Sequence, residues 1–243
     1  MSTESSDGSR VASPATTFES LGFVHEGGVK WRRDADGRTW RLTFMPQRRT
    51  KYSGEVRIIN AQGWRLRIDT TTSAMVRAYA VRRSVAQNGL LRRIHRFRRL
   101  EHVPLAAPAD AFVMVTSDAA WTRQLLASPE VLAAFSGLAE YRQAAGASAS
   151  VYFDPASMHY ASPLLQVDDV TTDRVASTLN GLMTLARAAD RLPPPALPST
   201  LNAAERLMRD HPYMVVIGFF AVGLAVLALG SLVLMVLAWM VLG

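Results

Sequence analysis

The alternation of apolar and polar residues predicts β-structure near the start of the chain. Segment 39–44 alternates strictly and follows Asp36-Gly37, a pair that is typical of tight hairpin turns. A second hairpin is predicted to join 55–59 to 64–68, again with apolar residues on one face and arginines on the other. These segments indicate an antiparallel sheet with one buried face and one face rich in arginine.

Apolar residues at helical spacing, together with residues typical of helix caps, predict several helices farther along the chain. The expected helices cover about 73–87, 90–100, 129–138 and 172–189, with a further helix carrying Trp121, Leu125 and Leu126. Either Ser117 or Asp118 is expected to cap this further helix. The expected strand is 111–115, and the expected hairpin joins 150–154 to 158–161.

The end of the chain is apolar without interruption. Residues 213–243 contain no charged side chain, so the run exceeds the roughly 18 residues that identify a membrane-spanning helix. Arg206 and Arg209 precede the run and no Lys or Arg follows it, which agrees with the positive-inside rule. The polar N-terminus lacks the features of a secretory signal. We therefore expect a tail-anchored, single-pass protein of the cell inner membrane with a cytoplasmic N-terminal domain.

Together these segments predict an α+β fold, in which an antiparallel sheet with packed helices is followed by a single C-terminal transmembrane helix. The chain before this helix is long enough for one large domain or two small ones. The expected organisation is a disordered tail (1–17), a basic β-rich and helical module (18–103), an α/β module (104–191), a proline-rich linker with a juxtamembrane helix (192–212) and the transmembrane anchor (213–243).

Small residues form a narrow stripe along the expected anchor. Gly218, Ala221, Ala225 and Ala228 share one helical face, where a second helix could approach closely. Ordinary transmembrane composition explains the same stripe, since Gly and Ala are common in such helices. We favour the ordinary explanation and keep helix packing as the alternative.

Charge is distributed unevenly along the chain. Between Lys30 and Val103 there are 19 Lys and Arg against 5 Asp and Glu, a net charge of +14. The rest of the chain carries 8 basic and 15 acidic residues, a net charge of −7. This asymmetry indicates an anionic partner for the basic module.

The sharpest basic feature is the expected helix 90–100, whose sequence is LLRRIHRFRRL. The residues expected to bind a partner or lipid are Arg92, Arg93, Arg96, Arg98 and Arg99, together with Arg65 and Arg67. Three interpretations stay open: a solvated face paired with the acidic half of the same chain, a surface for membrane lipid or a protein partner, and a nucleic-acid surface.

Motifs that carry chemistry are absent from the sequence. The lack of cysteine excludes disulfides, thiolate metal sites and a cysteine nucleophile. The five histidines, His25, His95, His102, His159 and His211, show no metal-ligand spacing. Because no phosphate loop, nucleophile elbow or HExxH sequence occurs, we assign no catalytic residue, cofactor or metal.

One segment resembles a pattern in other proteins. It runs from Phe112 to Asp118, followed by Arg123, Leu125-Leu126, Pro129 and Leu132. This segment of about 30 residues is similar to one in uncharacterised membrane-associated bacterial proteins, in which a strand ending in Ser-Asp precedes a short helix and a second helix containing proline. The resemblance implies a membrane-linked bacterial setting and no particular activity.

The features above favour a scaffold or adaptor that presents its basic domain to a protein partner or to anionic lipid. An enzyme or accessory subunit acting on a membrane-bound substrate is the first alternative, and His159 is a residue around which such a site could form. A membrane tether for nucleic acid is the second alternative.

Overall fold

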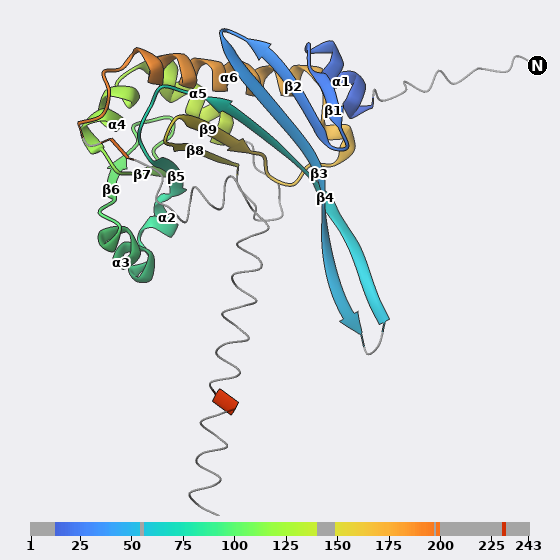
Figure 1. Ribbon diagram of the computed structural model, residues 1–243. Coiled ribbons are helices and arrows are strands. Elements are labelled where there is room, and N and C mark those ends of the chain that lie inside the picture. Colours follow the sequence, from blue (N-terminus) through green and yellow to red (C-terminus); the bar gives the residue numbers. More distant parts are fainter. Residues whose placement is uncertain (1–12, 54–55, 140–148, 197, 200–229, 232–243) are drawn as a thin grey trace, which may run out of the picture. The chain divides into compact units, whose positions relative to one another are not determined.

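The computed structural model describes residues 13–53, 56–139, 149–196, 198–199 and 230–231. The chain divides after Ser199, and all the strands and helices discussed below lie before this point. Their arrangement is α+β, with helices packed on a large antiparallel sheet (Figure 1).

The described strands form one nine-stranded sheet in the order β1-β2-β3-β4-β9-β8-β5-β7-β6. The strands are β1 (Val24–Gly27), β2 (Lys30–Ala35), β3 (Arg38–Ser53), β4 (Val56–Thr71), β5 (Ala78–Arg82), β6 (Glu101–Pro104), β7 (Phe112–Thr116), β8 (Ser150–Asp154) and β9 (Ser157–Ala161). The helices are α1 (Pro14–Ser20), α2 (Arg83–Ala86), α3 (Gly89–Phe97), α4 (Ala119–Leu126), α5 (Pro129–Ala139) and α6 (Thr172–Arg191), with a 3₁₀ turn at Val167–Asp169. The sheet therefore combines strands from the expected 18–103 and 104–191 segments.

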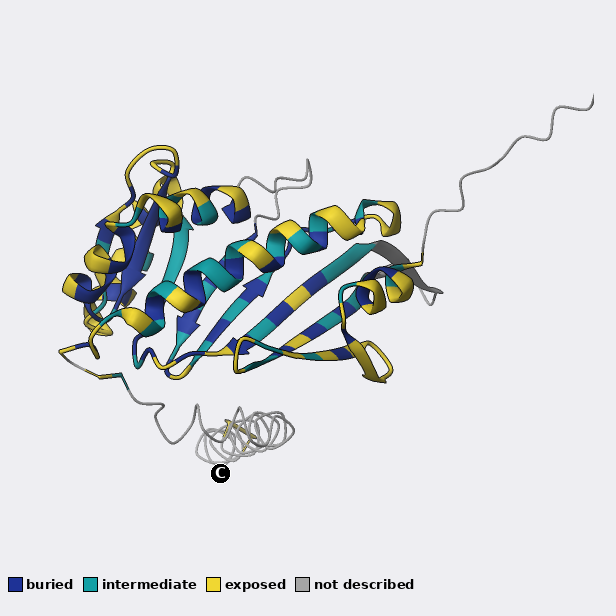
Figure 2. Ribbon diagram, turned by 90° about the horizontal axis from the view of Figure 1, so that it is seen from above, coloured by how far each residue is buried: buried dark blue, intermediate teal, exposed yellow. Residues whose placement is uncertain are grey.

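The core lies between one face of the sheet and the helices α1, α4, α5 and α6. Trp40, Leu42 and Ile68 are at most 1% exposed, which confirms the apolar face predicted from their alternation. Helix α6 runs across this face, and its stripe at Val175 and Leu179 is buried, as the helical spacing predicts (Figure 2). This packing leaves the alternate side chains of the strands on the opposite face.

The predicted turn at 60–63 is wrong. Strands β3 and β4 form one long hairpin that pairs continuously from Trp40↔Thr70 to Ser53↔Val56. Asn60 and Ala61 of the predicted turn instead pair with β3, and the register shifts between Gln47↔Gly63 and Arg48↔Ala61, which leaves Gln62 as the extra residue of a bulge. Gly63 adopts a φ of +133°, a conformation that favours glycine, so glycine at this position allows the backbone to form the bulge.

The predicted helix at 73–87 is also wrong, because this segment contains β5 followed by the short α2. Strand β5 pairs with β7 on one side and β8 on the other, and these long-range pairings outweigh local helix propensity. The other predicted helices near 90–100, 119–126, 129–138 and 172–189 are confirmed, as is the hairpin 150–161. Helix α1 (Pro14–Ser20) begins inside the segment 1–17 that was expected to be a disordered tail, and its Phe18 is fully buried.

Asp118 joins two parts of the fold. Its Oδ1 accepts the Trp121 N–H at 2.9 Å and caps α4, which settles the choice between Ser117 and Asp118. Its Oδ2 accepts the N–H of Ala196 at 3.0 Å, so the same carboxylate holds the proline-rich segment after α6 against the domain.

The predicted C-terminal transmembrane helix requires correction. Across the residues that the structure describes, no helix is long and apolar enough to cross a membrane. The longest of them, α6, carries Asp and Arg side chains along its 20 residues and is amphipathic. This finding contradicts the fold class with a transmembrane helix, the tail-anchored single-pass assignment and the inner-membrane localisation that depended on it. The predicted span 213–243 lies outside the described residues except for Gly230 and Ser231.

Candidate functional site

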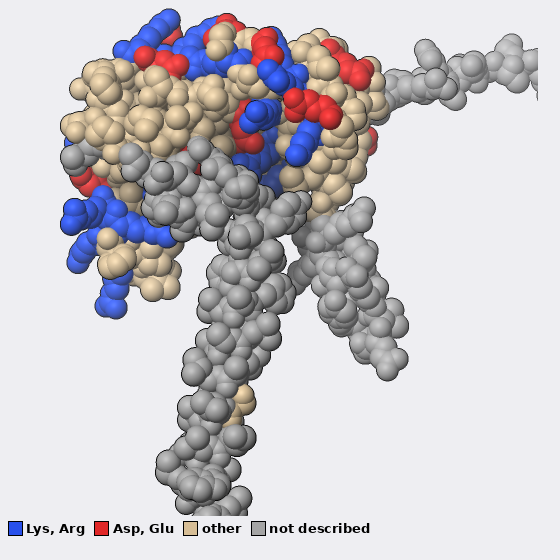
Figure 3. Space-filling model, in the orientation of Figure 1, with Lys and Arg blue, Asp and Glu red and all other residues tan. Residues whose placement is uncertain are grey.

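Helix α3 presents a basic surface at one end of the sheet. Its N-terminus is capped by Asn88, whose Oδ1 accepts the N–H of Leu90 at 3.0 Å. The predicted binding arginines of this segment are all exposed, namely Arg92, Arg93, Arg96, Arg98 and Arg99. Figure 3 shows Lys and Arg side chains gathered over the region of α3. No acidic residue occurs from 83 to 100, so this segment contributes positive charge alone.

The apolar stripe of α3 faces outward. Leu90, Ile94 and Phe97 are 70%, 41% and 91% exposed, although they share one helical face. An amphipathic helix ordinarily packs such a stripe into the core, but α3 is described along its whole length and its one buried residue is His95. We call the exposed stripe and its flanking arginines the α3 surface.

His95 seats α3 on the sheet through a chain of hydrogen bonds. Its Nε2 lies 2.9 Å from the Tyr79 hydroxyl of β5, and its Nδ1 lies 2.8 Å from Nε2 of His102 on β6. Burial, His102 and Arg98 lower the pKa of His95, and burial raises the pKa of Tyr79. We therefore infer that the Tyr79 hydroxyl donates to a neutral His95, which in turn donates from Nδ1 to His102.

Arg65 and Arg67 belong to another part of the domain. Both lie on β4, where Arg65 Nε donates to the Ser162 carbonyl at 3.1 Å and Arg67 forms an ion pair with Asp69. The structure thus brings the five arginines of 92–99 together and gives these two separate partners within the domain.

A row of cross-strand neighbours crosses the sheet on the face opposite α6. Adjacent strands align these residues directly, so successive side chains of the row lie side by side. From β2 to β6 the row consists of Arg32, Arg41, Asp69, His159, Tyr152, Tyr79, Val115 and His102. All but Val115 are polar, and we call this set the polar row.

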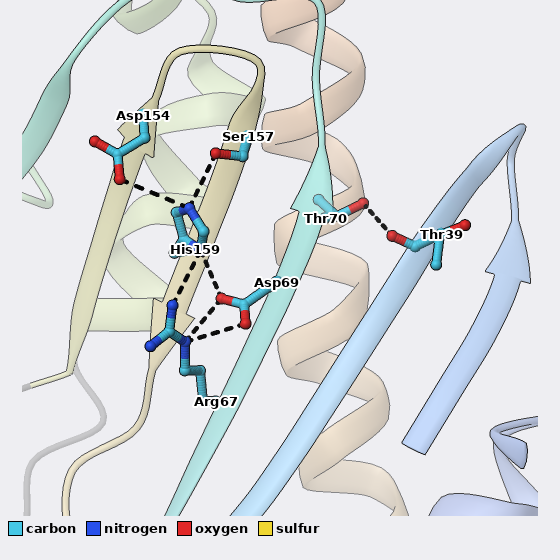
Figure 4. Close-up of polar contacts among 7 residues, drawn as sticks. All are labelled: Thr39, Arg67, Asp69, Thr70, Asp154, Ser157 and His159. Atoms are coloured by element: carbon cyan, nitrogen blue, oxygen red, sulfur yellow. Dashed lines mark hydrogen bonds and ion pairs between the residues drawn. The ribbon is translucent and has the colours of Figure 1, made fainter. Parts of the chain in front are cut away.

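The centre of the polar row contains a hydrogen-bonded set from β4 and β9. His159 Nδ1 lies 2.6 Å from Asp69 Oδ1, and His159 Nε2 lies 3.0 Å from Ser157 Oγ (Figure 4). Arg67 Nε donates to both oxygens of Asp69, at 2.9 and 3.1 Å. Ser157 and His159 share a face because they are two residues apart on one strand.

The protonation of this set follows from its contacts. Burial opposes ionisation of Asp69, but the hydrogen bonds from His159 and Arg67 outweigh it and lower the pKa of this carboxyl. An ionised Asp69 at 2.6 Å requires a proton on His159 Nδ1, which rules out acceptance by this nitrogen from Arg67, 3.5 Å away. In the neutral imidazole, Nε2 is then the acceptor for the Ser157 hydroxyl.

Two further side chains surround the His159 ring. Tyr152 stacks on it, with ring centroids 4.7 Å apart and planes inclined by 20°. Asp154 Oδ2 lies 3.7 Å from His159 Nε2, which is beyond hydrogen-bonding distance but close enough for attraction to a charged imidazolium. The ring is consequently held between two carboxylates and one aromatic face.

The small residues predicted to form a helix-packing stripe, Gly218, Ala221, Ala225 and Ala228, lie outside the described residues. Within the described part of the chain, no group of three or more His, Asp or Glu is placed to hold a metal ion.

Sequence reasoning named His159 only as a possible site and missed Ser157 and Asp69. The alternation of 157–161 could have placed Ser157 and His159 on one face. The pairing of His159 with Asp69, 90 residues earlier, depends on strand order and had no local signal.

Comparisons with known proteins give little further information. Neither protein-family models nor the curated proteins include a match to this chain. Among solved structures, the mycobacterial trehalose monomycolate transport factor A, TtfA, is similar over 76% of this chain and 96% of its own, with 8% identity and a TM-score of 0.47. That description concerns TtfA, and a likeness at this level establishes neither a common fold nor a common function.

Proposed function

We propose that this protein is a scaffold or adaptor that docks on an anionic lipid surface through the α3 surface. The observation that carries the proposal is the combination of an outward apolar stripe with arginines on both sides of it. A helix that lies in a bilayer interface has this composition, with Phe and Leu on one face and basic residues on the other.

The arginines supply attraction at a distance. Each basic side chain near an anionic leaflet contributes about 1 kcal/mol. Because 83–100 contains no acid, no neighbouring carboxylate within this segment offsets that attraction. The positive charge would also orient the domain so that α3 reaches the surface first.

The apolar stripe supplies attachment after contact. Transfer of a side chain such as Phe97 from water into an apolar phase contributes about 1.5–3 kcal/mol. Nucleic-acid phosphates would satisfy Arg92 and Arg96 but would leave Leu90 and Ile94 in water. A bilayer interface provides both an anionic layer and an apolar layer, and it requires no matching hydrogen-bond geometry for each arginine.

Vesicle co-sedimentation of the full chain tests the proposal. The charge variant Arg93→Gln/Arg96→Gln is compared with the control Arg123→Gln/Arg191→Gln, which removes the same charge from exposed positions outside α3. Loss of two arginines at the surface predicts roughly 30-fold weaker binding to anionic vesicles, whereas the control stays close to the parent protein.

Three outcomes would contradict the proposal. Equal binding to neutral and anionic vesicles would remove the electrostatic basis. Equal weakening in both double variants would mean that net charge, and not the α3 surface, is responsible. Binding to an acidic protein or to nucleic acid, with vesicles ignored, would assign the arginines to one of the other partner classes.

A further inference from the structure

We infer that Ser157 is an activated nucleophile, with His159 as its general base and Asp69 as a positioning residue, and that this site hydrolyses carboxylic esters. The inference concerns the polar row and not the α3 surface, so it extends beyond the proposed docking function. It is carried by the two hydrogen bonds that link the three side chains at 3.0 and 2.6 Å.

The geometry assigns a different role to each side chain. Ser157 Oγ faces His159 Nε2, the nitrogen that is free to accept a proton once Asp69 holds the Nδ1 proton. Asp69 is itself fixed by two hydrogen bonds from Arg67, so it cannot rotate away from the imidazole. A serine, an oriented histidine and an ionised carboxylate in this order form the set required for acyl transfer, and the set is recognised by geometry, not by sequence position.

The surroundings favour the charge that forms during attack. When His159 takes the serine proton, it becomes an imidazolium between Asp69 on one side and Asp154 on the other. Both carboxylates stabilise this cation, and Tyr152 limits tilting of the ring by stacking on it. These contacts lower the energy of the protonated histidine relative to the resting site.

The proposed reaction has two steps. Ser157 Oγ bonds to the ester carbonyl carbon while its proton passes to His159 Nε2, and the proton then passes to the leaving alcohol oxygen as the ester C–O bond breaks. In the second step, water gives a proton to Nε2 and bonds to the acyl carbon, and the acyl–Oγ bond breaks. The proton returns to Oγ, the acid product leaves, and no other reactant is required.

The alternative is that these contacts merely tie β4 to β9. Ser73 provides a matched comparison, because its hydroxyl donates to Asp190 Oδ1 at 2.9 Å. A hydroxyl that donates to a carboxylate alone should not become a nucleophile, since a carboxylate is too weak a base to take its proton. Reactivity at Ser157 and not at Ser73 therefore separates activation by His159 from simple hydrogen bonding.

A fluorophosphonate probe and p-nitrophenyl acetate test the inference on the full chain. We expect the probe to label one site, identified as Ser157 by peptide mass spectrometry, and the ester to be hydrolysed. Ser157→Ala should abolish both signals, whereas Ser73→Ala should change neither. Asp69→Asn should slow labelling at least about 100-fold, because loss of the carboxylate removes the imidazole orientation on which activation depends.

The outcomes that overturn the inference are distinct. If the folded parent protein is not labelled by the probe, the inference is wrong. Equal labelling rates in the parent and in Asp69→Asn would also overturn it. Thermal unfolding of each variant ensures that only folded proteins are compared. If Asp69→Asn fails to fold, Ser157→Ala is the variant that tests the inference, because it removes a single oxygen atom. Vesicle binding by Ser157→Ala should equal that of the parent, so failure of this inference is distinguishable from failure of the docking proposal.

Discussion

Two phenylalanines in opposite environments give the sharpest test of how α3 is placed. Phe97 is 91% exposed on α3, whereas Phe135 is 1% exposed on α5 within the core. The same substitution, Phe→Ala, should therefore act on binding at one position and on stability at the other.

The expected magnitudes follow from this difference in exposure. Phe97→Ala removes an apolar ring that would enter the lipid interface, so vesicle binding should weaken by about 2 kcal/mol, or roughly 30-fold. Its free energy of unfolding should change by less than about 0.5 kcal/mol, because the ring has little contact with the folded domain. Phe135→Ala leaves a cavity in the core and should lower the free energy of unfolding by about 3–5 kcal/mol.

Urea denaturation measures the stability of each variant, and titration with anionic vesicles measures its binding. Phe135→Ala is assayed for binding only at urea-free conditions in which it remains folded. A loss of more than about 1 kcal/mol of stability in Phe97→Ala would show that this ring is packed, because solvent-exposed positions tolerate truncation. Unchanged vesicle affinity in the same variant would refute the reasoning that the stripe enters the interface.

Three further predictions concern the fold around the sites. Burial and the neighbouring His102 lower the pKa of His95 below 6.5, so the free energy of unfolding should be fully retained above pH 6.5 and should decline as the pH falls further. Urea titrations between about pH 7.5 and about pH 5 should show this decline, and His95→Gln should make it shallower. Gly63→Ala should destabilise the domain by more than about 1 kcal/mol, because φ is +133° and the added Cβ would lie 2.9 Å from the Leu165 carbonyl oxygen. Thermal unfolding measures this loss, and an unchanged melting temperature would contradict it. Asp118→Ala should lower the free energy of unfolding by about 1–2 kcal/mol through loss of the α4 cap, and it should speed proteolysis of the segment after α6. Proteolysis at the rate of the parent protein would argue against a role for the contact between Asp118 and Ala196.

Period-two alternation predicted the core side of the sheet well. Trp40 and Leu42 are buried because the pleat sends alternate side chains to opposite faces, which is a local property of a strand. The helix predicted at 73–87 failed for β5, because Ala78–Arg82 contains residues compatible with a helix and becomes a strand only between two distant partners.

The candidate sites show the same limit. Helical spacing revealed the stripe of α3, but whether Phe97 faces the core or water depends on where the helix sits in the fold. Likewise, the alternation of β9 can place Ser157 beside His159, whereas Asp69 joins them only through the pairing of β4 with β9. Local patterns therefore identified the candidate faces, and strand order determined which residues meet there.

The position of the β8–β9 hairpin has a consequence for biosynthesis. β9 and β8 separate β4 from β5, although both neighbours leave the ribosome much earlier. Some 90 residues separate Asp69 from its partner His159, which corresponds to roughly 5–20 s of translation. During that interval the nascent chain holds two incomplete sheets with unpaired edges, the kind of surface on which chains associate wrongly. Cellular yield should thus depend on chaperones that shield these edges until the hairpin has been translated.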